Sequence, residues 1–226
     1  MALLMGAYEL LNWLHIVLFA YWLGADFGVF FAARLMARPG LSYDDRMRIR
    51  ELLQFVDLAP RVALILILPV GLHMTALRWG LPLSAGALSA LWLASLAWLI
   101  LMLSVHARQG SARGEYLRRA DLGVRYLVLI TMLALGGGSL ITGAPIADTW
   151  LATKVLLFAV IIALGLALRV ISTGWAPALA QLRAGDNIAA AEQAILTTRR
   201  RGAVTALTLW AVLLLMAFLG TVKPFA

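Results

Sequence analysis

Six long apolar segments dominate the chain. They cover approximately residues 10–33, 62–79, 83–107, 125–147, 149–169 and 203–222. Each is long enough for one helix to cross the apolar core of a bilayer, which takes roughly 20 residues. The segments are continuous, whereas the strands of a membrane barrel alternate apolar and polar positions over about ten residues. The pattern predicts an all-α integral membrane protein in which residues 1–226 form a single bundle of six transmembrane helices.

The positive charges are concentrated in alternate connections. Sixteen of the 19 Lys and Arg residues follow the first, third and fifth segments, and only Arg78, Lys154 and Lys223 lie elsewhere. Because loops rich in Lys and Arg stay in the cytoplasm, we expect both termini on the outer side. The first cation, Arg34, follows the first segment, so no signal peptide is visible. These features predict a multi-pass protein of the bacterial inner (cytoplasmic) membrane.

Composition excludes several classes of protein. Hydrophobic residues make up 63% of the chain and charged residues 13%, with a mean hydropathy of +0.91. Soluble domains average about 45–50% apolar and about 25% charged residues. The absence of Cys excludes disulfides, iron–sulfur clusters and thiol nucleophiles. The net charge of +8 is explained by membrane topology, so we expect the lipid bilayer as a partner and no nucleic acid.

Two cytoplasmic connections contain amphipathic segments. Residues 43–58 place apolar side chains among charges, which predicts a short interfacial helix that ends at Pro60. Residues 176–198 are rich in Ala, with Asp186 as a suitable N-cap, and predict two further short helices.

Two histidines inside the apolar segments are the main candidates for a site. His15 and His73 each lie about six residues from the outer end of their segments, or roughly 9 Å deep at 1.5 Å per residue. Ionisable residues within a membrane face the bundle interior and mark functional sites. Two imidazoles at one depth on successive antiparallel helices suit the two axial ligands of a haem iron. A third histidine, His106, lies at the cytoplasmic end of its segment and cannot share that plane.

Other residues fit a haem near the outer face. Arg78 and Lys154 are the cations available there for the propionates. Trp22 and the glycines of the fourth segment, Gly138 among them, are expected to line the pocket. The alternatives are that both histidines make hydrogen bonds between helices, or that they bind copper together with the neighbouring Met74.

One acidic residue lies deep in the first segment. Asp26 is toward its cytoplasmic end and is expected to pair with Arg61 or Arg125. The other interpretation is a place in a proton relay.

Two stretches resemble the CopD-like membrane superfamily. Its first-helix pattern matches Leu14-His15-Ile16 with Tyr21-Trp22-Leu23-Gly24, and a later helix pair matches Thr142-Gly143, Trp150-Leu151 and Lys154. This superfamily includes copper-resistance protein D domains and, more distantly, HemJ-type protoporphyrinogen oxidases and the membrane domain of PuuD-type urate oxidases. The resemblance implies a helical bundle that in HemJ-type members binds haem b through histidine. Among the candidate site residues, only His15 and Lys154 stand at positions that match the patterns of the superfamily.

These observations lead to three hypotheses. The first is a b-type haem protein that transfers electrons near the outer face, with His15 and His73 as axial ligands and a quinol or redox protein as partner. The second is a copper transport or tolerance protein. The third is a non-catalytic scaffold subunit. Assembly into a homo-oligomer is compatible with each.

Overall fold

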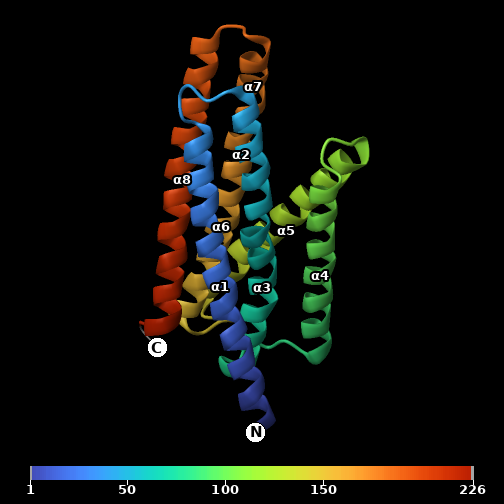
Figure 1. The fold of residues 1–226 in the computed structure, drawn as a ribbon. Coiled ribbons are helices and arrows are strands. Elements are labelled where there is room, and N and C mark those ends of the chain that lie inside the picture. Colours follow the sequence, from blue (N-terminus) through green and yellow to red (C-terminus); the bar gives the residue numbers. More distant parts are fainter. Residues whose placement is uncertain (1, 225–226) are drawn as a thin grey trace.

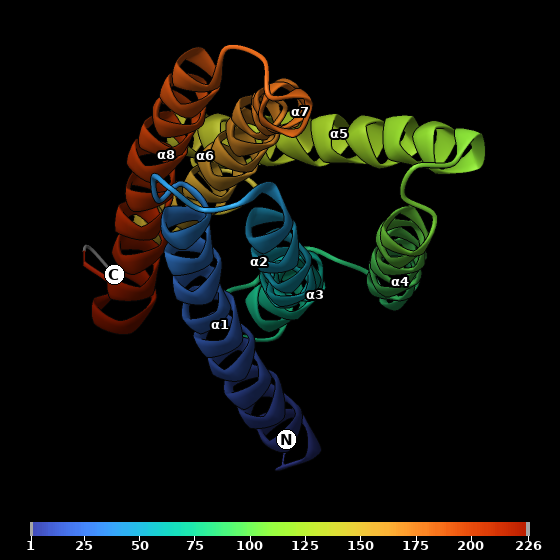
Figure 2. The same ribbon diagram turned by 45° about the horizontal axis from the view of Figure 1, so that its top comes forward.

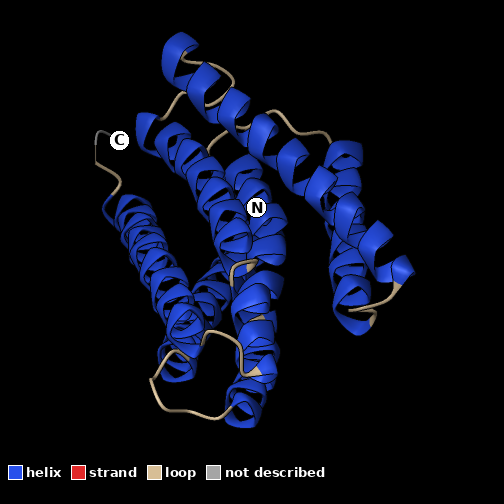
Figure 3. Cartoon of the chain, turned by 90° about the horizontal axis from the view of Figure 1, so that it is seen from above, coloured by secondary structure: helices blue, strands red, loops and turns tan. Residues whose placement is uncertain are grey.

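The computed structural model describes residues 2–224, and 86% of the chain is helical. Eight helices follow one another along the chain: α1 (Ala2–Met36), α2 (Tyr43–Val56), α3 (Leu58–Arg78), α4 (Ala85–Ala107), α5 (Ala112–Thr142), α6 (Thr149–Ser172), α7 (Trp175–Ala184) and α8 (Ile188–Val222). The described residues contain no strand (Figure 3). The all-α fold predicted from the apolar segments is confirmed.

Six helical stretches are long and apolar enough to cross a membrane. Each overlaps one of the six predicted segments, although residues 79, 83–84 and 143–147, which were predicted within segments, lie outside the helices. The chain is therefore a multi-pass membrane protein. Several helices extend well beyond the apolar part. α5 begins at residue 112, before the apolar run that starts near residue 125, and α8 begins at residue 188, before the run that starts near 203.

The helices form an open bundle. α1 packs along α3, and α6 packs between α5 and α8. α5 runs obliquely across the other helices, and α4 lies to one side of the bundle against α3 and α5 (Figures 1 and 2). α1 meets α8 over a shorter stretch, where Phe27 and Phe30 pack on Trp210 with ring centroids 4.3 and 5.1 Å apart.

The two ends of the bundle differ in charge. Both chain termini lie at one end, and α7 and the connection from α1 to α2 lie at the other (Figure 1). We call these the termini end and the arginine end, because the second one collects the arginine-rich connections. By the positive-inside rule, the arginine end is the one expected in the cytoplasm.

Side-chain caps explain where several helices begin. The hydroxyls of Ser42, Ser84 and Ser111 accept hydrogen bonds of 3.1, 3.1 and 3.0 Å from backbone N–H groups in the first turns of α2, α4 and α5. The cap of α8 is Asn187, not Asp186 as the sequence suggested. Residues 188–198 are therefore the first turns of α8 rather than a separate short helix.

A proline also has a different role from the one expected. α2 ends at Val56, and Pro60 lies in the first turn of α3 instead of ending α2. A proline is tolerated there because its missing N–H has no partner within the helix in any case.

Candidate functional site

His15 lies in the α1–α3 contact near the termini end. A methyl carbon placed on Gly71 of α3 would be 3.4 Å from Cε1 of His15, so the ring rests on the backbone of α3. Its Nδ1 is enclosed and has no hydrogen-bond partner in the described part of the protein. A buried polar atom without a partner is costly, and a bound ligand or an ordered water can supply the missing interaction.

His73 faces a different helix. Its Nδ1 accepts a hydrogen bond of 3.3 Å from Nε1 of Trp92 on α4. His73 follows Gly71 by two residues, and two residues turn a helix by about 200°. The two histidines therefore lie on different sides of α3. His15, which belongs to α1, contacts the side of α3 that carries Gly71, and His73 projects from the side that meets α4.

Aromatic rings and cations gather at the termini end. Trp79 packs between Tyr8 and Trp150, with ring centroids 5.7 and 5.3 Å away. The guanidinium of Arg78 lies 5.9 Å from the ring of Tyr8, and Nζ of Lys223 lies 5.5 Å from the ring of Trp79. The indole N–H of Trp150 is buried without a partner among residues 2–224. This group joins α1, the end of α3, α6 and α8.

Lys154 lies one turn further along α6 from Trp150. A methyl carbon on Gly220 of α8 would be 2.6 Å from Nζ of Lys154, so the glycine makes room for the ammonium group between α6 and α8. Within residues 2–224, Lys154 forms no ion pair, and neither does Arg78 or Lys223. Three cations that form no ion pair within residues 2–224 therefore lie at one end of the bundle.

These residues fit part of what a haem needs. His15 supplies one nitrogen donor, and the three cations match the charge of two propionates. His73, on the α4 side, does not join His15 in this arrangement. No group of three or more His, Asp or Glu side chains capable of holding a metal ion occurs in the described part of the chain.

Trp22 lies away from the expected pocket, and Gly138 does not lie at a close contact between helices. Trp22 is 4% exposed and lines a cavity toward the arginine end, together with Asp26. A methyl carbon on Gly138 would meet no atom within 4 Å, whereas one on Gly136 would lie 2.5 Å from the backbone nitrogen of Leu156 on α6. The glycine at which two helix backbones come close is therefore Gly136.

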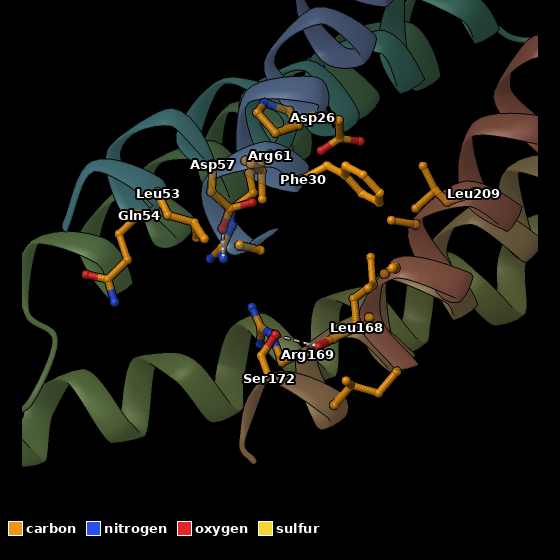
Figure 4. Close-up of a pocket in the computed structure, with 18 of the residues that line it drawn as sticks. Asp26, Phe30, Leu53, Gln54, Asp57, Arg61, Leu168, Arg169, Ser172 and Leu209 are labelled. Carbon is orange, nitrogen blue, oxygen red and sulfur yellow. Dashed lines mark hydrogen bonds and ion pairs between the residues drawn. The ribbon is translucent and has the colours of Figure 1, made fainter. Parts of the chain in front are cut away.

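Asp26 does not have the partners that the sequence suggested. Arg61 pairs with Asp57, and Arg125 pairs with Asp121 at 3.0 Å. Arg61, Asp57 and Arg125 line the same cavity as Asp26 (Figure 4), and Asp121 lies outside its lining.

Asp121 is the centre of a buried ionic cluster that sequence analysis missed. The side chain is 1% exposed. Its carboxylate accepts hydrogen bonds from Nε1 of Trp98 at 3.0 Å, from Nε of Arg125 at 3.0 Å and from Nη2 of Arg169 at 2.7 Å. The cluster links α4, α5 and α6. The four-residue spacing of Asp121 and Arg125 is typical of an ion pair within one helix. The apolar pattern, however, placed Asp121 in the connection before the fourth segment and Arg125 at the start of that segment.

The fold and these side chains define a multi-pass α-helical membrane protein with a polar interior at each end. Comparison with protein-family models, curated proteins and solved structures finds no match. The CopD-like resemblance therefore stays a prediction.

Proposed function

We propose that this chain is a b-type haem protein of the bacterial inner membrane, which transfers electrons near the outer face with His15 as an axial ligand. The observation that carries the proposal is the enclosed, unpartnered Nδ1 of His15 at the α1–α3 contact. The ring rests on the backbone of α3, and a neutral imidazole nitrogen that has no other partner can bind a metal ion.

The cations of the termini end support the same proposal. Arg78, Lys154 and Lys223 come from three different helices or helix ends, and none forms an ion pair within the described residues. Lys and Arg side chains that are not engaged in ion pairs can bind anionic groups such as propionates. By the positive-inside rule, this end is the outer one.

A bound haem would supply reversible one-electron transfer. The residues of this chain would bind and orient it: His15 through its imidazole, and the three cations through the propionates. The rings of Tyr8, Trp79 and Trp150 would limit the access of water at this end. A quinol or a redox protein is the proposed electron partner.

The test is a dithionite-reduced minus oxidised visible spectrum of the purified protein, with metal analysis of the same sample. We expect a Soret band that shifts on reduction and about one haem per chain. His15→Ala should lose the haem. His73→Ala is the matched control, because it removes an imidazole at a similar depth on the other side of α3, and it should retain the haem.

Each other outcome has a definite meaning. Loss of haem in both variants would restore His73 as the second axial ligand. Retention in both would overturn the role of His15. A featureless spectrum with stoichiometric copper would support the transport hypothesis instead. A featureless spectrum without metal would leave the scaffold hypothesis.

A further inference from the structure

A cavity of about 370 Å³ lies between α1, α3, α6 and α8 toward the arginine end, and side chains of α2, α5 and α7 complete its wall (Figure 4). Its deeper wall is aromatic and apolar, formed in part by Trp22, Phe30 and Trp210. The rest of the wall is strongly basic. Its charged residues are Arg50, Arg61, Arg125, Arg169, Arg199, Asp26 and Asp57.

The positive charge of this wall is not balanced by the protein. Asp57 pairs with Arg61, and Asp121, behind the wall, is shared by Arg125 and Arg169. Counting Asp121, five guanidinium groups face three carboxylates, which leaves at least two positive charges in excess. Asp26, the remaining carboxylate, lies in the deeper part near Trp22 and Trp210 and forms no ion pair in the described part of the chain.

Two guanidinium groups retain donors without partners. Nη2 of Arg125 and Nη1 of Arg169 are enclosed and make no hydrogen bond within residues 2–224. Arg125 is only 7% exposed, so its guanidinium has little contact with bulk water. Donors without protein partners beside a cavity can bind an acceptor that enters it.

The basic groups approach the cavity from opposite walls. In Figure 4, Arg61 on α3 and Arg169 on α6 point toward one another across the open space. Like charges repel, and an anion placed between them would remove that repulsion. A tetrahedral phosphate offers oxygens toward both walls, whereas the two oxygens of a carboxylate lie in one plane and suit a single guanidinium.

We propose that this cavity binds the phosphate group of an anionic ligand between Arg61 on one wall and Arg125 and Arg169 on the other. Its position fits a lipid of the cytoplasmic leaflet, since basic pockets between transmembrane helices on that side bind anionic headgroups. Soluble phosphate has the same chemistry and is the second possible source. The site is independent of the haem proposed near His15.

The test measures binding to the full-length protein in neutral detergent through tryptophan fluorescence, because Trp22 and Trp210 line the cavity. The probes are phosphatidylglycerol, zwitterionic phosphatidylcholine and inorganic phosphate. Both lipids carry a phosphate, but the choline cation of phosphatidylcholine is repelled by the arginines in excess, so we expect phosphatidylglycerol to bind about tenfold more tightly. Saturation by inorganic phosphate alone would also support the site and would identify a soluble source.

Three variants locate the binding. Arg61→Gln and Arg169→Lys should each weaken phosphatidylglycerol binding about tenfold. Arg48→Gln is the matched control, because Arg48 is 80% exposed on α2 and does not line the cavity. Circular dichroism checks that each variant is folded. If Arg61→Gln unfolds, the affinity of Arg169→Lys alone tests the proposal, because its Lys keeps the positive charge beside Asp121. Equal binding of both lipids, or equal weakening in Arg48→Gln, would overturn the proposal.

Discussion

Two buried ionic clusters of this protein differ in their balance of charge. Arg46 is 0% exposed and pairs with Glu192 at 2.5 Å, which joins α2 to the start of α8. Its guanidinium also donates to the carbonyls of Leu41 and Arg38 at 3.3 and 3.2 Å. The Asp121 cluster instead sets two arginines against one carboxylate.

The atoms left unpaired show what this difference means. The Arg46–Glu192 pair is neutral as a whole, because it consists of one guanidinium and one carboxylate. It leaves one donor (Nη1 of Arg46) and one acceptor (Oε2 of Glu192) enclosed without partners. At Asp121, both unpaired atoms are donors, from Arg125 and Arg169. A neutral pair stabilises the contact between helices. An unbalanced cluster both stabilises the fold and presents positive charge to the neighbouring cavity.

The largest effect is expected for Asp121→Asn. The substitution keeps the volume but leaves two largely buried guanidinium groups without a counter-charge, which should cost about 3–5 kcal/mol of unfolding free energy. Denaturant unfolding in detergent micelles, followed by helical circular dichroism, measures the loss. A loss below about 1 kcal/mol, as for exposed pairs, would show that water already reaches this cluster. If the variant does not fold, Trp98→Phe removes one hydrogen bond to Asp121 and tests the same cluster more mildly.

A smaller effect is expected for Glu192→Gln. Arg46 keeps its two carbonyl acceptors, and Glu192 is 23% exposed, so the loss should be about 1–2 kcal/mol. The same unfolding measurement applies. A cost equal to that of Asp121→Asn would remove the distinction between the balanced and the unbalanced cluster.

The smallest effect is expected at the surface. Glu115 pairs with Arg118 at 2.6 Å within the first turns of α5, and both side chains are exposed. Exposed pairs gain little because water and salt screen them. Glu115→Gln should leave the melting temperature unchanged within error. A clear destabilisation would mean that burial is not what separates the two inner clusters from this pair.

The sequence predicted the helices well because apolar length is a local property. The six segments were visible without tertiary information, and their even number explains why the termini lie at one end of the bundle. The errors arose where a helix continued past its apolar part. Asp121 was placed in a loop because the start of α5 is polar, although the helix begins at residue 112.

The arrangement of the candidate site could be predicted only in part. Depth along a helix follows from the number of residues, and it made His15 and His73 look like a pair. The direction in which a side chain points around the helix depends on which neighbour packs there. Trp92 on α4 binds His73, and no local pattern shows that contact. The cavity is lined by residues of seven helices and was not visible in the sequence.

α8 is one continuous helix of 35 residues without proline. At the arginine end, Arg199 packs on Phe30, with its Cζ 5.8 Å from the ring centroid, and at the termini end Gly220 contacts Lys154. Arg199 and Gly220 are separated by about 32 Å of helix. Because a helix without proline bends only gently, it behaves as a stiff rod. A tilt of α8 that moves its contacts at one end of the bundle therefore also moves its contacts at the opposite membrane surface.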